Sequence, residues 1–502
     1  MYRGFKKFEN IVKEEKIYII GAILFALVGF GIYIFPHYSP DTYGMMVEAE
    51  NGTVLSYLKG AVTRNLRNGR YSLGITKAVL KLIGLNPQGA GVVANACSII
   101  LVAGNILCAF LGIKHYFTPR FRILIFGTVV GIFMCPCYAD WFQFPEAVPY
   151  YLLGVLLCHV GVIRIYKNKM ISGILILFVA VGYYQIILSF FVFYYILILI
   201  LELSEKKFDK QLEYYLINVS KGIGIYAMLV GGNFLWVKIG GSTRIHMDLS
   251  YNVSTVLHAQ KSLWMMGSLG KRTYVYVGLF LIAIIVYLFE IVRLVSRNKQ
   301  YVMFLIMTLL GIVGIYLSVF VTHIFAEAWV SQRTVVIFYA IPFYVIICAI
   351  KLIPPDGTKR SEMVLALVIL FLNAIYIFKT NNLAIDLIKT NVSDQFVSEL
   401  IGAKIDEYEK EQGIRVENIS FIQDTSKVYA YPGIFMSHDL NVRAWSVSWA
   451  REPMFNFYTG KNLVSVKCPD EVYETIFKDK NWNAFSEEQV YFAGNTVYIG
   501  IY

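Results

Sequence analysis

The feature that most constrains this chain is a series of about eleven apolar runs, most of them close to the roughly 20 residues that an α-helix needs to cross a bilayer. Backbone polar groups find no water in lipid, so such runs must form helices that satisfy their own hydrogen bonds. The runs cover residues 17–35, 92–113, 121–134, 148–165, 171–184, 186–203, 216–239, 274–294, 302–321, 335–353 and 363–378. We therefore predict an α-helical polytopic membrane protein with about eleven transmembrane helices.

The amino-acid composition excludes several other classes of protein. The chain is 57% hydrophobic and 16% charged, whereas soluble globular domains are about 45–50% apolar and about 25% charged. A surface so poor in charge cannot be covered with polar groups in water. A soluble enzyme, a disordered chain and a coiled coil are therefore excluded.

Basic residues in the short loops predict how the helices are oriented. Membrane proteins carry an excess of Lys and Arg in their cytoplasmic loops. The N-terminal segment and every second short loop are rich in basic residues, whereas intervening loops such as residues 135–147 contain none. The alternation predicts a multi-pass protein of the cell (plasma) membrane with a cytoplasmic N-terminus and an extracytoplasmic C-terminus. The excess of Lys and Arg is thus explained by the orientation of the chain in the lipid bilayer, and binding to a nucleic acid is not expected.

Two predicted outer loops, residues 36–91 and 240–273, are long enough to carry function. In the first loop, apolar residues recur close to helical spacing, with basic residues between them. The apolar positions are Val54, Leu55, Leu58, Val62 and Leu66, followed by Leu73, Leu80 and Ile83. This pattern predicts helices that lie in the plane of the membrane surface.

The segment from residue 379 onward has a different character. It contains 17 acidic and 12 basic residues, whereas residues 1–378 contain 17 acidic and 33 basic residues. A helix ending near Gly413 is followed by strand-like runs at 419–423, 463–467, 490–493 and 496–502, the last two joined by a Gly-Asn turn. We expect two domains: a membrane domain at 1–378 and a small extracytoplasmic α/β domain at 379–502.

Polar residues gather at the predicted outer ends of the helices. Asp41 follows the first apolar run by six residues, a position that suits either a catalytic carboxylate or the N-cap of the next helix. Asp140 and Glu146 flank a group of aromatic residues, which favours either a sugar-binding site or an aromatic belt at the membrane interface. Gln185 interrupts what would otherwise be one long apolar run. It is expected either to belong to the site or to form a simple tight turn.

Arg333 lies at the entry to the tenth apolar run, where ionisable groups are costly and usually functional. A guanidinium can hold a phosphate through two hydrogen bonds. The alternative is an ion pair between Glu327 and Arg333 that only anchors the helix. No His or Cys spacing predicts a metal site, and no Walker A motif is present. Because nucleotide sugars are not available outside the cell, a sugar donor there must arrive on a lipid carrier.

Several segments in order resemble a known family. They are Ser39-Pro40-Asp41-Thr42-Tyr43, Asn68-Gly69-Arg70, the segment at 141–149 that contains Glu146, and Tyr183-Tyr184-Gln185. Together with the topology, they resemble the GT-C glycosyltransferases and, more narrowly, the GtrII-type glucosyltransferases that modify bacterial O-antigen. The resemblance implies a GT-C-like membrane domain.

The resemblance also implies an activity and roles for residues. The enzyme would transfer a sugar, glucose in this family, from undecaprenyl phosphate to a surface glycan, with inversion at the sugar carbon. Asp41 would be the general base, and Arg70 or Arg333 would hold the lipid phosphate. Asp140 and Glu146 would bind sugar hydroxyls or assist Asp41, and Gln185 would contact substrate. No cofactor is certain, although some relatives by fold use a divalent cation.

Two further hypotheses concern the whole chain. A transporter or flippase of lipid-linked glycans is the alternative function, but such proteins place charged groups in a central cavity and keep outer loops short. In the acidic tail, residues 445–458 are rich in aromatic side chains. Trp445 and Trp449 are expected either in the core of the tail or in contact with the acceptor glycan.

Overall fold

We describe a computed structural model of the chain. The described residues are 14–51, 54–85, 91–206, 208–241, 248–264, 272–296, 300–325, 330–354, 359–423, 429–437, 440–480 and 485–501. Within these residues, eight helices are long and apolar enough to cross a membrane. Three shorter apolar helices, Met170–Val181, Ile187–Leu203 and Val336–Leu352, coincide with the other predicted runs. A polytopic membrane protein is therefore supported, and the count of eleven stays a prediction.

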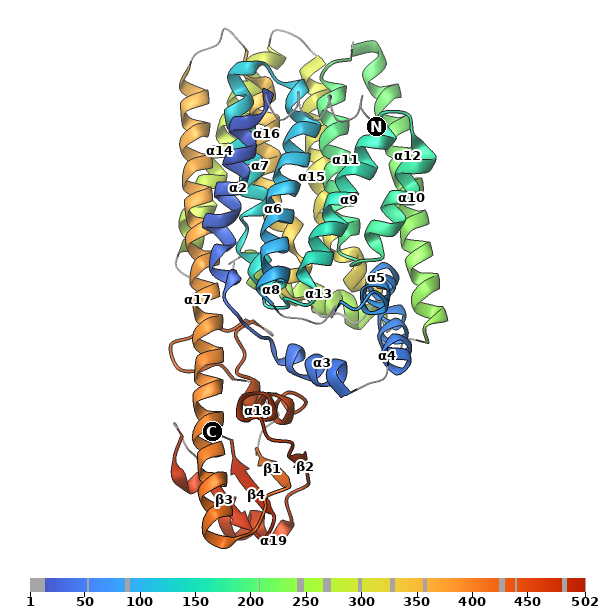
Figure 1. The fold of residues 1–502 in the computed structure, drawn as a ribbon. Helices are drawn as coiled ribbons and strands as arrows, with labels where there is room; N and C mark the ends of the chain where they lie inside the picture. Colours follow the sequence, from blue (N-terminus) through green and yellow to red (C-terminus); the bar gives the residue numbers. More distant parts are fainter. Residues whose placement is uncertain are drawn as a thin grey trace.

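The long and the shorter apolar helices pack side by side into one bundle (Figure 1). Its members are α2 (Lys16–Phe30), α6 (Val92–Ile113), α7 (Arg122–Phe133), α9 (Val148–Tyr166), α10 (Met170–Val181), α11 (Ile187–Leu203), α12 (Phe208–Ile239), α14 (Thr273–Val295), α15 (Gln300–Phe325), α16 (Ile341–Leu352) and α17 (Lys359–Gln412). We call the end of the bundle nearest the C-terminal β-sheet the lower end, as drawn in Figure 1.

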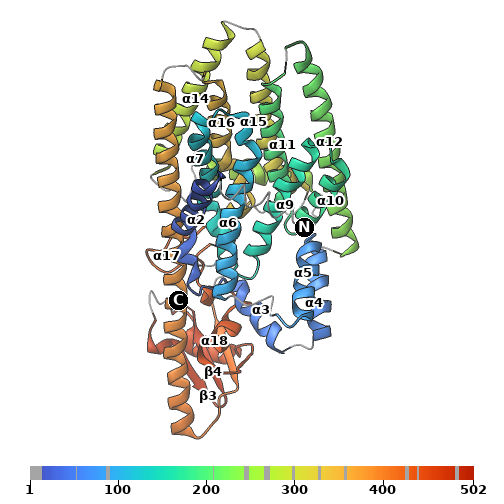
Figure 2. The same cartoon turned by 45° about the horizontal axis from the view of Figure 1, so that its top comes forward.

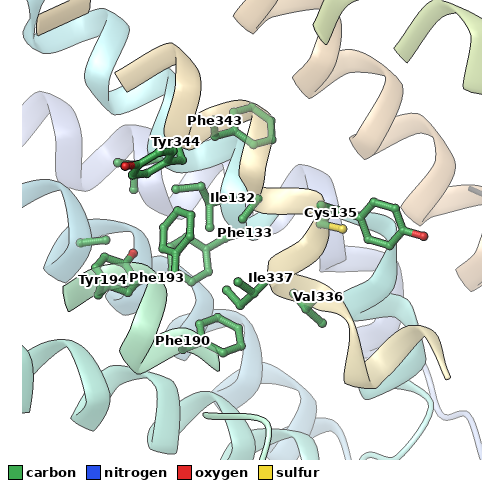
Figure 3. Packing of buried hydrophobic residues seen from close by; sticks show 14 of the residues in the cluster. Ile132, Phe133, Cys135, Phe190, Phe193, Tyr194, Val336, Ile337, Phe343 and Tyr344 are labelled. Carbon is green, nitrogen blue, oxygen red and sulfur yellow. The ribbon is translucent and has the colours of Figure 1, made fainter. Parts of the chain in front are cut away.

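The middle of the bundle is packed with aromatic and branched side chains. Phe193 of α11 lies close to Phe133 of α7, and its ring centre is 6.4 Å from that of Tyr344 of α16 (Figure 3). These three residues and Phe190 of α11 are almost completely buried. Nearly every residue of α11 is apolar, which is typical of a helix surrounded by other helices on all sides. This core fixes the ends of the surrounding helices, from which the polar residues project.

Helix α17 extends far beyond the bundle. Its 54 residues correspond to about 80 Å, more than twice the roughly 30 Å of a bilayer's hydrocarbon core. The helix runs without a break through residue 378, where the sequence predicts a domain boundary. Its lower half carries the C-terminal sheet (Figure 1), so a rigid element joins the two parts of the chain.

The C-terminal sheet contains strands at the predicted places. Its order is β2-β1-β4-β3, formed by β1 (Asn418–Ile422), β2 (Val464–Ser465), β3 (Val490–Ala493) and β4 (Thr496–Gly500). β4 pairs parallel with β1 and antiparallel with β3. Ile419 and Val497 share an apolar core with Ile401 and Ile405 of α17. Helices α18 (Arg451–Thr459) and α19 (Asp470–Val472) complete this region.

Three helices follow α2 in the first long loop: α3 (Pro40–Asn51), α4 (Val54–Arg67) and α5 (Tyr71–Leu82). α4 and α5 lie at the lower end of the bundle, beside α12 and α10, and α3 lies beneath it and runs across its long axis (Figures 1 and 2). The helices predicted in this loop are present, while their orientation to a membrane stays a prediction. The second long loop contains α13 (Leu249–Trp264), and the short α8 (Ala139–Phe142) precedes α9.

Candidate functional site

The six predicted site residues come from separate elements that meet near the lower end of the bundle. Asp41 is in the first turn of α3, and Arg70 immediately precedes α5. Asp140 belongs to α8, and Glu146 lies between α8 and α9. Gln185 is in the turn between α10 and α11, and Arg333 is in a short 3-10 helix at Gln332–Thr334. The chain therefore gathers at one end residues that are up to about 290 positions apart.

The first turn of α3 is capped by Ser39 and not by Asp41. The Thr42 amide donates to Ser39 Oγ (3.3 Å), and the Ser39 amide donates to Thr42 Oγ1 (3.2 Å), the reciprocal pattern of a capping box. The alternative that Asp41 is the N-cap is thus wrong. Asp41 is exposed, and its Oδ1 accepts a 3.0 Å hydrogen bond from Trp449 Nε1 of the C-terminal region.

Glu146 is buried next to α3. Thr42 Oγ1 donates to Glu146 Oε2 at 3.1 Å, so neighbouring residues of α3 present Asp41 and hold Glu146. The other oxygen of Glu146 is buried and has no hydrogen-bond partner among the described residues. Burial raises the pKa of Glu146, and the nearby Asp41 carboxylate raises it further, whereas Lys77 lowers it. An unpaired buried carboxylate oxygen is costly in a folded chain, and a catalytic or binding role is one explanation for it.

Lys77 was missed as a site residue by the sequence prediction. It lies on the buried face of α5 and is only 5% exposed, with its ammonium 5.8 Å from the centre of the Tyr150 ring. The pKa of Lys77 is lowered to about 8, mainly by burial; Glu146 opposes this change, whereas Arg70 and Arg64 contribute to it. In the sequence, Lys77 looks like one of several basic residues on a surface helix, and only its burial singles it out.

Arg70 is held by two stacked tyrosine rings. Its Nη1 donates to Tyr151 Oη at 3.1 Å, and its guanidinium carbon lies 4.9 Å from the centre of the Tyr184 ring. The two rings stack with their centres 4.5 Å apart. The buried Nε of Arg70 has no hydrogen-bond partner among the described residues. Arg70 is therefore oriented by its neighbours with a donor left over for an anion.

Asp140 and Arg333 are brought together as an ion pair. Asp140 Oδ2 accepts from the Arg333 amide at 2.9 Å, and Asp140 Oδ1 lies 3.3 Å from Arg333 Nη1. Gln143 also donates to Asp140, and the guanidinium of Arg333 lies 5.0 Å from the centre of the Phe144 ring. Asp140 is thus occupied in positioning Arg333. Glu327, the partner that the sequence offered for Arg333, lies outside the described residues.

Gln185 contacts the turn between α4 and α5. Its Nε2 donates to the backbone oxygen of Asn68, next to Gly69, which has a positive φ of 67°. A Cβ on Gly69 would lie 2.6 Å from Gln185 Nε2 and 2.9 Å from Asn233 Oδ1, so the turn requires glycine. In this structure, Gln185 holds the backbone of Asn68, two residues before Arg70.

The two tryptophans of the tail have separate environments. Trp445 is 3% exposed and packs in the core with Phe421 and Phe455, as the structural alternative predicts. Trp449 is 64% exposed and reaches Asp41. The tail therefore touches the candidate site through Trp449.

Comparison with known proteins identifies the family of the chain. Residues 53–350, more than half of the sequence, match the model of the glucosyl transferase GtrII family. The chain belongs to the GtrII glucosyltransferase family. No curated protein and no solved structure matches the chain. The GtrII match includes Arg70, Lys77, Glu146 and Arg333, whereas Asp41 and the C-terminal sheet lie outside the matched range.

The arrangement suits the chemistry of a membrane glycosyltransferase of the GtrII family. Arg70, Lys77 and Arg333 supply cations that can neutralise a phosphate, and Asp41 and Glu146 supply carboxylates on the α3 side. Among the described residues, no group of three or more His, Cys, Asp or Glu side chains could hold a metal ion. A cavity of about 230 Å³ between α9, α11 and α12 is lined by other residues, including Tyr166 and Glu202.

Proposed function

We propose that this protein transfers a sugar, glucose, from a polyprenyl phosphate carrier to a surface glycan on the extracytoplasmic side of the membrane. Membership of the GtrII family supports sugar transfer in a membrane. The observation that carries the proposal further is the meeting of cations and carboxylates at the lower end of the bundle. The opposite charges suit the two halves of the reaction, in which a phosphate leaves and a hydroxyl attacks.

The donor side of the site would be formed by Arg70, Lys77 and Arg333. The phosphate of a polyprenyl-linked sugar is an anion at the membrane surface, and its negative charge grows as the bond to the sugar breaks. Arg70 keeps an unpaired buried donor, and Lys77 is a buried ammonium. Fixed cations that face developing charge stabilise the transition state without reorganising. Asp140 would contribute by holding Arg333 in place.

The acceptor side would be formed by Asp41, with Glu146 behind it. Asp41 takes the proton from the acceptor hydroxyl while that oxygen attacks the anomeric carbon. The bond between this carbon and the phosphate oxygen breaks, and the phosphate leaves with the electron pair. Attack opposite to the leaving group inverts the configuration of the sugar. Burial raises the pKa of Glu146, so Glu146 is suited to hold sugar hydroxyls next to the exposed Asp41.

The proposal is tested with the purified protein in lipid nanodiscs. The donor is undecaprenyl phosphate carrying radiolabelled glucose, and the acceptor is surface glycan extracted from a strain that lacks the protein. We expect the wild type to label the glycan and Asp41→Asn to do so about 10²–10⁴-fold more slowly. Glu399→Gln is the matched control, because it removes an exposed carboxylate from a different helix, α17. No labelling by the wild type contradicts the proposed function, and normal labelling by Asp41→Asn contradicts the role of Asp41.

A further inference from the structure

We infer that Trp449 and Asp41 together form a binding site for an uncharged sugar unit of the acceptor glycan. This inference rests on the proposed function and extends it, because it assigns part of the acceptor site to the C-terminal region. That region lies outside the range that matches the GtrII family. The acceptor would therefore bind between the tail and the membrane bundle.

The exposure of Trp449 is the first observation. Its side chain is 64% exposed although its indole N–H is engaged by Asp41. Burying an exposed indole is strongly favourable, since aromatic side chains bury 150–250 Å² each. The C–H face of a hexose is apolar and flat enough to pack on such a ring. An exposed indole beside the proposed base would thus hold a sugar where its hydroxyl can reach a carboxylate.

The second observation is that several contacts hold α3 and the tail together. Tyr43 Oη of α3 lies 2.7 Å from Tyr458 Oη of α18. Asn391 of α17 bonds both the amide and the carbonyl of Tyr38, at 2.8 and 2.9 Å. The position of Trp449 relative to Asp41 is therefore determined by contacts on both sides of the pair. A site assembled from two parts of a chain needs this kind of preorganisation.

The geometry at Asp41 leaves one oxygen available. Trp449 donates to Oδ1, and within the described part of the chain no hydrogen bond or ion pair is formed by Oδ2. The indole N–H therefore fixes the orientation of the carboxylate while Oδ2 faces the acceptor. Residues 379–502 contain 17 acidic and 12 basic residues. Their net negative charge repels an acidic sugar, so the proposed site favours an uncharged one.

The experiment measures transfer at saturating donor while the concentration of the extracted surface glycan is varied. Trp449→Ala should raise the KM for the glycan at least tenfold. In a second series, with saturating glycan and varied donor, it should leave the KM for undecaprenyl phosphate glucose within twofold. Trp449→Phe keeps a ring and loses the N–H donor, so it should restore most of the acceptor KM with a lower kcat. Phe396→Ala is the control. It removes a ring of α17 that is 60% exposed, and it should change neither the KM for the glycan nor the KM for the donor.

The outcomes separate the inference from the proposed function. A wild type that transfers sugar while Trp449→Ala keeps the wild-type KM for the glycan overturns the inference alone. A wild type without transfer contradicts the proposed function instead. If Trp449→Ala lowers the melting temperature, Trp449→Leu and Trp449→Phe decide the matter. The inference then requires a raised acceptor KM for Leu and not for Phe, and equal values for the two overturn it.

Discussion

At the scale of the residue, the cations of the candidate site differ in how they are held. Arg333 is paired with Asp140, whereas Lys77 faces the ring of Tyr150 and interacts electrostatically with Glu146. Arg70 rests on stacked tyrosine rings and keeps an unpaired donor. Guanidinium groups and ammonium groups also differ in shape, so each cation should contribute to donor binding in its own way.

Arg70 is expected to contact the donor phosphate through its planar guanidinium group. Arg70→Ala should raise the donor KM by a factor that corresponds to about 1.5–3 kcal/mol, the usual contribution of a hydrogen bond to a charged group. Arg70→Lys should restore only part of this loss, because a point charge cannot form two parallel hydrogen bonds or stack on Tyr184. Lys59→Ala removes an exposed charge from the same loop and is the control. An unchanged donor KM in Arg70→Ala would remove Arg70 from the phosphate site.

Lys77 predicts a dependence of donor use on pH. Burial lowers the pKa of Lys77 to about 8, so the ammonium is charged below that pH and neutral above it. Because kcat/KM reports the ionisation of the free enzyme, kcat/KM for the donor should fall as the pH rises through about 8. Lys77→Arg stays charged and should abolish this fall. The same fall in Lys77→Arg would show that another group titrates.

Sequence reasoning finds residues by type and position, and it fails where packing decides. Glu146 was selected because it lies with Asp140 beside aromatic residues next to an apolar run, and Arg70 because of the resemblance to the GtrII-type glucosyltransferases. Lys77 was missed because its burial depends on how α5 packs against Tyr150 of α9. The roles of Asp140 and Gln185 were also not predictable, since their partners Arg333 and Asn68 lie 193 and 117 positions away.

At the scale of the element, α17 connects the bundle to the C-terminal sheet. Asp394, buried in its lower half, accepts hydrogen bonds from the Ala444 amide at 3.0 Å and from Tyr431 Oη at 2.8 Å. Trp445 Nε1 donates to the Asp394 carbonyl at 3.3 Å. The sequence predicted the strands from their composition, but not that one helix would continue from the membrane run into the tail. Periodicity alone cannot show whether two helical runs are continuous.

Asp394→Ala should detach the tail from α17. The change removes the acceptor of the buried Ala444 amide, at about 1–3 kcal/mol. It also removes one hydrogen bond of the half-buried Tyr431 hydroxyl. We expect a lower melting temperature in detergent and faster proteolysis between α17 and β4, with a smaller effect for Asp394→Asn. Glu399→Ala, on the exposed side of α17, should behave like the wild type. Equal stability of Asp394→Ala and Glu399→Ala would contradict this role.

At the scale of the whole molecule, the site residues and the C-terminal sheet share one end of the bundle (Figures 1 and 2). The alternation of basic loops predicts that this end is outside the cell. A reporter that is active only in the cytoplasm should therefore give full activity when fused after Lys206 and at most a few per cent when fused after Gly413. Activity after Gly413 would place the site on the cytoplasmic side, contradict the predicted orientation and remove the argument for a lipid-linked donor.

The most direct measurement concerns the cell surface itself. The gene is deleted in its host, the surface glycans are extracted, and their sugar composition and linkages are determined. The account predicts the loss of one side-branch sugar, glucose. The sugar should return with the wild-type protein or Glu399→Gln, but not with Asp41→Asn at equal protein level. An unchanged glycan in the deletion strain, or full restoration by Asp41→Asn, would contradict the account.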